Sequence, residues 1–306
     1  MDIALMIEGQ NGLNWPRWQR LAEAVEQLGF VGLYRSDHFT NPRPPDLDSL
    51  ELWTSLTWLA SHTRRIEFGP LVAPVSFRNP VHMARTAAAI DDLSGGRLQL
   101  GLGAGWQERE HANYGFDLLP IPQRLARFQE ALEVVSRLLN SEEPVTYEGT
   151  YYHLQDATLL PRPQRAGGPP IVIGGGRAIL PMVVRYAAEW NVAFKPLDDV
   201  VKLSKRLDTL LEQQGRRPEE VRRTLMTRVI FGRTEQEVEQ MISTAASGRS
   251  LEELRQAGVL AGTASAIVDQ LGQLADIGMQ RVMLQWIELD DLDRLAALAQ
   301  GILPQL

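Results

Sequence analysis

The chain has 306 residues, of which 44% are hydrophobic and 23% charged, and its formal net charge is −7. It contains no cysteine, which excludes disulfide frameworks, thiolate metal sites and a cysteine nucleophile and is compatible with a reducing cytoplasm. The acidic balance argues against a nucleic-acid-binding protein, and no run of roughly 18 apolar residues indicates a membrane helix, so we expect a cytoplasmic protein.

Short apolar segments alternate along the chain with segments in which apolar residues recur at helical spacing. The first is Ile3-Ala4-Leu5-Met6-Ile7, which is too short for a helix, and a helix that begins near Trp15 and stops at Gly29 follows it. The remaining predicted strands lie at 31–34, 66–68, 98–101, 171–173, 191–194, 225–231 and 281–286, and the helices between and after them at 50–60, 80–91, 123–139, 179–188, 197–213 and 289–302.

This alternation predicts the fold class. Several strands are apolar at consecutive positions, which is typical of a parallel sheet buried on both faces. Eight strand–helix units in about 300 residues favour an α/β fold of the closed (β/α)8 TIM-barrel type, formed by a single domain over residues 1–306. The segment Glu8-Gly9-Gln10-Asn11-Gly12 after the first strand lacks the glycine spacing of a dinucleotide-binding turn.

Two segments interrupt the barrel pattern. The first insertion, at about 145–165, is aromatic and β-prone and predicts a small hairpin that leads into a proline-rich link. The second, at about 232–262, predicts an extra helical stretch before the last unit.

The carboxyl ends of the barrel strands are where chemistry is expected. Asp37 and His38 follow the second strand, where a carboxylate beside an imidazole can favour its charged form, as a proton donor requires. Alternatively, Asp37 caps a turn and His38 is a surface residue. Glu8, after the first strand, and Glu108, after the fourth, are further candidates for proton transfer.

Two glycine-rich turns are candidate ligand sites. The run Gly174-Gly175-Gly176-Arg177 exposes backbone N–H groups that suit a phosphate, although a flexible turn is the alternative interpretation. The run Gly101-Leu102-Gly103-Ala104-Gly105-Trp106 would let a planar ring lie against the backbone, with Trp106 as a wall, unless the glycines serve only tight packing. The five histidines show no paired spacing, so we expect no metal site.

These segments together resemble those of a known family. Four motifs carry the resemblance: Ser36-Asp37-His38-Phe39, the segment 69–80 (GPLVAPVSFRNP), the segment 100–115 (LGLGAGWQEREHANYG) and the segment 173–177 (IGGGR). They occur in the right order along essentially the whole chain, which is similar to the bacterial luciferase-like superfamily and, within it, to coenzyme F420-dependent oxidoreductases.

The resemblance implies a flavin or deazaflavin bound in the barrel mouth. A non-prolyl cis peptide would lie at Pro70-Leu71 beneath the ring, with Val72 and Ala73 along the same edge. The glycine-rich turns would then contact the ribityl side and the phosphate, and the acid–histidine pair would be Asp37 and His38. The ribityl residues are Gly103, Ala104, Gly105 and Trp106, and the phosphate residues are Gly174, Gly175, Gly176 and Arg177.

The chain also departs from part of that family. Sugar-phosphate dehydrogenases of the deazaflavin branch carry a tryptophan four residues after the histidine and a glutamate in the loop after strand four. Pro42 and Trp106 stand at these places here, so glucose 6-phosphate is not an expected substrate. The proton-transfer residue stays open between His38, Glu8 and Glu108. Arg35, Arg177 and Arg233 are candidates to hold the anionic tail of a deazaflavin.

The resemblance supports three functional hypotheses. The first is hydride transfer between coenzyme F420 and a small organic substrate. The second is a monooxygenase that uses dioxygen and reduced FMN, and the third is a non-catalytic flavin-binding barrel. A separate flavin or F420 reductase or dehydrogenase would supply the reduced cofactor, and the family expectation is a homodimer.

Overall fold

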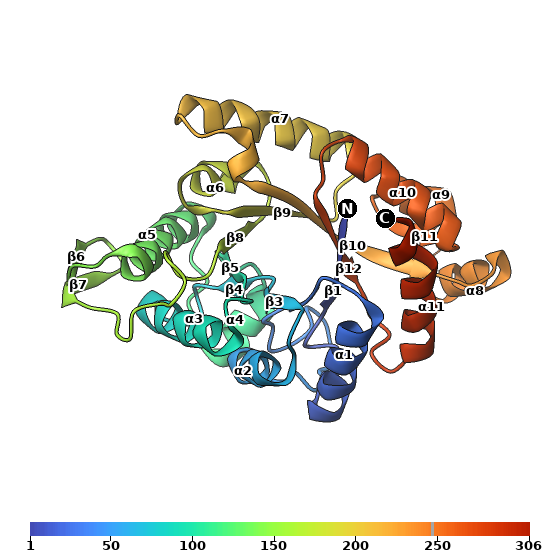
Figure 1. Ribbon diagram of the computed structural model, residues 1–306, viewed down its shortest axis with the longest axis horizontal. Helices are drawn as coiled ribbons and strands as arrows, with labels where there is room; N and C mark the ends of the chain where they lie inside the picture. Colours follow the sequence, from blue (N-terminus) through green and yellow to red (C-terminus); the bar gives the residue numbers. More distant parts are fainter. Residues whose placement is uncertain (246–247) are drawn as a thin grey trace.

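The computed structural model describes residues 1–245 and 248–306 and confirms a nearly closed parallel barrel surrounded by helices (Figure 1). Every neighbouring pair of barrel strands is parallel, in the order β3-β2-β1-β12-β10-β9-β8-β5-β4. The barrel strands are β1 (Asp2–Ile7), β2 (Gly32–Arg35), β3 (Glu67–Pro70), β4 (Ala73–Pro74), β5 (Leu100–Gly103), β8 (Ile171–Gly174), β9 (Glu189–Ala193), β10 (Arg222–Phe231) and β12 (Arg281–Gln285).

The helices that cover the barrel begin and end at sequence signals. In α1, the Asn14 side chain accepts a hydrogen bond from the backbone N–H of Arg17, and Gly29 ends the helix in a left-handed conformation with φ of 96°. The covering helices are α1 (Trp15–Leu28), α2 (Leu52–His62), α3 (Pro80–Ser94), α5 (Ile121–Asn140), α6 (Leu180–Tyr186), α7 (Leu197–Gln213), α10 (Ala264–Asp276) and α11 (Leu292–Ile302).

The first predicted insertion is a hairpin, as expected, and the second is partly different. Strands β6 (Val145–Glu148) and β7 (His153–Ala157) pair antiparallel. The second insertion contains α8 (Glu235–Ala245) and α9 (Leu251–Gln256), and it ends in a short strand, β11 (Leu260–Gly262), that the sequence analysis placed in a helical stretch. Strand β11 lies beside the carboxyl end of β10 and pairs with it in parallel, so it adds a short strand to the barrel sheet there.

The barrel closes where β3 and β5 approach each other without intervening side chains. The backbone N–H of Gln99 donates to the carbonyl of Phe68 at 2.8 Å. A Cβ on Gly69 would lie 1.9 Å from the carbonyl oxygen of Gln99, and a Cβ on Gly101 would lie 2.0 Å from the carbonyl oxygen of Pro70. Glycine is therefore required on both sides of this junction.

The amino-terminal end of the barrel is plugged by a polar cluster around one buried arginine. Arg281 donates to the Tyr34 hydroxyl at 2.7 Å, to Glu67 at 2.7 Å and to Asp2 at 3.2 Å. Apolar side chains fill the middle of the interior. They include Met6, Leu71, Val172, Met226 and Met283. A ligand can therefore enter the barrel only at its carboxyl end.

Candidate active site

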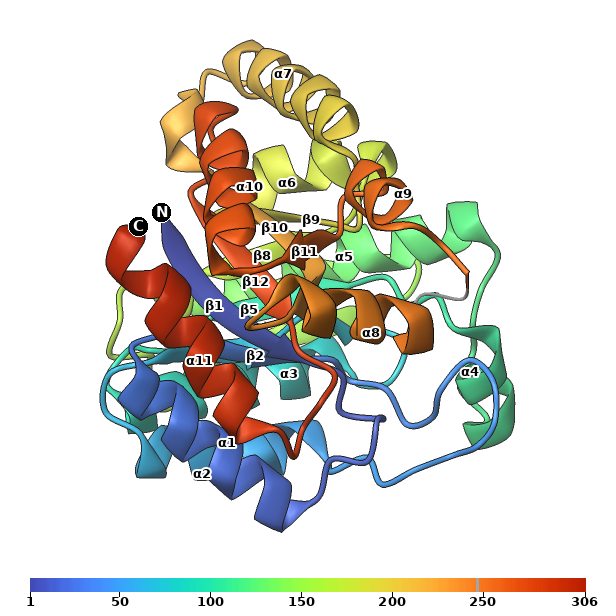
Figure 2. The same cartoon turned by 90° about the vertical axis from the view of Figure 1, so that its right-hand side faces the viewer.

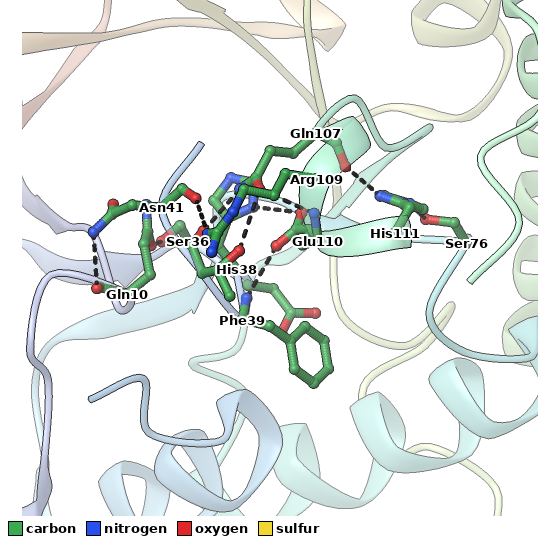
Figure 3. Close-up of polar contacts among 12 residues, drawn as sticks. Gln10, Ser36, His38, Phe39, Asn41, Ser76, Gln107, Arg109, Glu110 and His111 are labelled. Atoms are coloured by element: carbon green, nitrogen blue, oxygen red, sulfur yellow. Dashed lines mark hydrogen bonds and ion pairs between the residues drawn. The ribbon is translucent and has the colours of Figure 1, made fainter. Parts of the chain in front are cut away.

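The carboxyl ends of the strands form one mouth, which is partly covered by α4 (Glu108–Tyr114). Figure 2 shows α4 and α8 at the end of the barrel away from both chain termini. The segment after β2, which carries His38, lies against α4 in the close-up of Figure 3.

The centre of this contact is an imidazole held by a buried carboxylate. Nδ1 of His38 lies 2.8 Å from Oε1 of Glu110, and the backbone N–H of Phe39 donates to Oε2 of the same carboxylate at 3.0 Å (Figure 3). Glu110 is 1% exposed. Because the carboxylate accepts, Nδ1 carries a proton. Within the part of the chain that the structure describes, no group pairs with Nε2 of His38.

The environment of His38 favours its protonated form. Burial lowers the pKa of the imidazole, but the hydrogen bond and charge of Glu110, with smaller contributions from Glu8 and Asp37, outweigh burial and leave the pKa above its usual value. His38 therefore takes up a second proton, on Nε2, more readily than an unperturbed imidazole and could deliver it to a bound molecule.

The Asp37 side chain does not contact the His38 ring directly, although its charge contributes to the raised pKa of His38. The Asp37 carboxylate forms an ion pair with both terminal nitrogens of Arg78, and Arg78 also contacts Glu51 at 3.1 Å. Burial raises the pKa of Asp37, and the Arg78 guanidinium opposes that shift. Side chains of consecutive residues in an extended segment point to opposite sides, so Asp37 and His38 find different partners.

Glu108, the glutamate predicted to be catalytic, is exposed at the start of α4, whereas Glu110 makes the contact with His38. The missed signal is a polar pattern at positions i, i+3 and i+4. Gln107, Glu110 and His111 lie on one face of α4 and are all buried. Gln107 also begins the helix, since its side-chain oxygen accepts from the backbone N–H of Glu110.

Further contacts fix α4 over the mouth. Gln107 donates to the Thr40 carbonyl at 2.8 Å, and Arg109 forms a two-point ion pair with Asp46. An aromatic cluster packs between α4 and the loops after β2 and β4. It consists of Phe39, Phe77, His111, Tyr114 and Phe116.

A second carboxylate is clamped at the mouth. Glu8 accepts from the side-chain amide of Gln285 at 2.7 Å and from that of Gln10 at 3.0 Å. The Gln10 amide is oriented in turn because its oxygen accepts from the Ser36 hydroxyl, which itself accepts from the backbone N–H of Gly9. Glu8 is therefore a fixed acceptor close enough to influence His38.

The cis peptide expected in this region lies one residue later than predicted, between Leu71 and Val72. The Val72 side chain packs against glycine backbone: a Cβ on Gly103 would lie 2.5 Å from Cγ2 of Val72, and a Cβ on Gly174 3.2 Å from Cγ1. Ala73, by contrast, is fully buried in the surrounding core, so its side chain is not available to a ligand. Pro70 lies within β3.

The glycine-rich turns at the mouth leave room for a ligand, and one of them has backbone N–H groups that could bind it. A Cβ on Gly176 would meet nothing within 4 Å. In the described residues, the backbone N–H groups of Gly176, Arg177 and Ala178 donate to no protein acceptor, which fits a phosphate. In the other turn, Gly105 has φ of 86°. Trp106 is 59% exposed and forms a T-shaped contact with the His38 ring, their centroids 5.4 Å apart.

One of the arginines predicted to hold an anionic tail is unavailable. Arg35 is 1% exposed, and its guanidinium donates to Ser55 and to the carbonyls of Leu50 and Ser36. Burial lowers the pKa of Arg35 to about 10. Arg177 and Arg233 are both exposed.

The described ranges contain no cluster of three or more acidic or histidine residues arranged to bind a metal ion. None of the helices described is long and apolar enough to span a bilayer.

A nearly closed parallel barrel with hydrogen-bonded polar side chains at the carboxyl ends of its strands defines a (β/α)8 barrel of the kind that enzymes use. The fold matches that of an F420-dependent secondary alcohol dehydrogenase solved with an F420–acetone adduct, with a TM-score of 0.84, 16% identity and 98% of each chain covered. The family model of the luciferase-like monooxygenases matches residues 3–298, so the chain belongs to this family of oxidoreductases.

Characterised relatives fall into two groups. An F420-dependent glucose-6-phosphate dehydrogenase of Kineococcus radiotolerans is 29% identical over 92% of this chain and 81% of its own length. The 4-hydroxyprotoasukamycin monooxygenase of Streptomyces nodosus subsp. asukaensis is 34% identical over 60% of this chain. This chain spans about half the length of that monooxygenase, since 47% of it is covered.

Proposed function

We propose that this protein transfers a hydride between coenzyme F420 and a small organic substrate. The observation that carries the proposal is the His38–Glu110 pair, in which a buried carboxylate raises the pKa of an imidazole at the barrel mouth. The extensive similarity to an F420-dependent dehydrogenase supports the choice of cofactor.

The residues present fit such a cofactor. Val72 packed on Gly103 and Gly174 would lie under the ring, and the free N–H groups of Gly176 and Arg177 would hold its phosphate. When bound, a deazaflavin supplies two-electron hydride chemistry. His38 then donates the Nε2 proton to the oxygen of a carbonyl substrate during reduction and accepts a proton from an alcohol during oxidation. Glu110 keeps the His38 ring in the same orientation during reduction and during oxidation.

A second candidate is a monooxygenase that uses reduced FMN and dioxygen. This function is favoured by the 34% identity to the 4-hydroxyprotoasukamycin monooxygenase, which extends over 60% of this chain. In this case, too, the cofactor would be reduced by a separate enzyme. A homodimer is proposed for either function, and light scattering on the purified protein tests it.

Cofactor preference is the first expected result to check. We expect the ligand-free protein to bind F420 with micromolar or tighter affinity and FMN at least tenfold more weakly, measured by cofactor fluorescence and tryptophan emission. A preference for reduced FMN would overturn the F420 proposal and favour the monooxygenase. Tight binding without turnover of any tested substrate would favour a non-catalytic flavin-binding barrel.

A further inference from the structure

Arg228 is placed by strand alternation inside the barrel near its mouth. On the same face of β10, the Thr224 hydroxyl donates to Glu189 at 2.9 Å, and Met226 packs in the interior apolar cluster. Residues two apart on a strand share a face, so Arg228 also points inward. It lies opposite Gln285 in the parallel register of β10 and β12.

Among the described residues, the guanidinium of Arg228 has no hydrogen-bond or ion-pair partner. Within residues 1–245 and 248–306, every other arginine or lysine is exposed, forms an ion pair or donates a side-chain hydrogen bond. Arg228 is only partly exposed and does none of these. A partly buried charge without a partner is costly, and natural proteins usually compensate it.

The neighbouring acid does not supply this compensation. Each oxygen of Glu8 accepts from a side-chain amide, one from Gln10 and the other from Gln285, and Glu8 forms no ion pair with Arg228. The side chain that packs on Gly103 and Gly174 at the mouth is that of Val72, which is apolar. Arg228 therefore has no acidic partner in the described residues that would compensate its charge.

We infer that Arg228 binds an anionic group, a phosphate or a carboxylate, of a molecule held in the mouth. The inference rests on the proposed function only in placing the ligand site at this end of the barrel. The anion belongs either to the cofactor or to the substrate. Guanidinium groups bind both kinds of oxyanion through paired hydrogen bonds.

The ligand-free protein gives a test that needs neither cofactor nor activity. Arg228→Met removes the charge and keeps much of the side-chain length. Because it removes an uncompensated charge, we expect the variant to melt a few degrees above the wild type. The matched control is Arg64→Met, which removes an exposed arginine just before β3, at the end of the barrel away from the mouth, and should leave the melting temperature unchanged.

Anion binding tests the inference directly. In isothermal titration of the ligand-free wild type, we expect citrate and inorganic phosphate to bind. Arg228→Met should weaken their binding by about 10- to 100-fold, the range for a hydrogen bond to a charged group. Arg228→Lys should lose less affinity, and Arg64→Met should lose none. Equal anion affinities in the wild type and Arg228→Met, or no anion binding to either, would overturn the inference.

Two further titrations identify the source of the anion. If it is the cofactor phosphate, Arg228→Met will weaken FMN binding but leave riboflavin, which lacks the phosphate, unaffected. If it is a substrate carboxylate, FMN and F420 affinities will not change, and the cofactor-loaded wild type will still bind citrate. If the wild type bound neither F420 nor FMN, the proposed function would be wrong. The comparison of citrate affinity between the wild type and Arg228→Met would still decide whether Arg228 binds an anion.

Discussion

Replacing His38 by alanine is expected to lower turnover by about 100- to 10,000-fold, the usual contribution of one positioned acid or base. The variant loses the Nε2 proton and keeps the glycine-lined surface around Val72, so F420 affinity should change little. Steady-state kinetics and cofactor titration on the same preparation check both parts. A variant that retains wild-type turnover would remove His38 from proton transfer.

Glu110→Gln separates the role of the carboxylate from that of the ring. The raised pKa of His38 means that reduction should be fastest at low pH and fall as pH rises through that pKa. Without the Glu110 charge the pKa drops, so this fall should begin at lower pH. Glu108→Gln is the matched test of the exposed glutamate on the same helix, and we expect less than about a threefold effect. An equal loss in both variants would assign the role to Glu108 as well.

Gly69→Ala is expected to destabilise the fold by about 3 kcal/mol, near the upper range for overpacking. The new Cβ would lie 1.9 Å from the Gln99 carbonyl oxygen, which is backbone and cannot move without opening the barrel. For a chain of 306 residues, thermal melting should show a decrease of roughly 5 °C, or the protein should fail to accumulate.

The control for this substitution is another glycine with free space around it. Gly272 lies in α10, and a Cβ there would meet nothing within 4 Å. Gly272→Ala should stabilise by about 0.5–1 kcal/mol because alanine loses less backbone entropy in a helix. Equal melting temperatures for the two variants would show that the β3–β5 junction tolerates a side chain.

The barrel could be predicted because its strands are buried on both faces and therefore read as short apolar runs, as in residues 3–7. The partner of His38 could not be predicted from chain proximity, since Glu110 is 72 residues away and belongs to a short helix without an apolar stripe. Asp37 is adjacent in sequence but faces Arg78.

Charged residues on strands were the other source of error. Arg35 was a candidate for ligand binding but satisfies its donors within the protein. Arg228 was not singled out, although the alternation along β10 places it inward. Side chains alternate between the two faces of a strand, so the sequence predicts to which side of the sheet a charged residue points. Whether that residue has a partner depends on segments far away in the chain.

The two oxygens of Glu110 also have a thermodynamic consequence. One holds the His38 ring and the other the backbone N–H of Phe39, so lifting α4 from the mouth would break both contacts at once. The imidazole binds its proton more tightly when α4 is seated, and linkage then requires that seating α4 takes up protons. The contact between α4 and His38 is therefore strongest when the imidazole is protonated and weakens as pH rises through the raised pKa of His38.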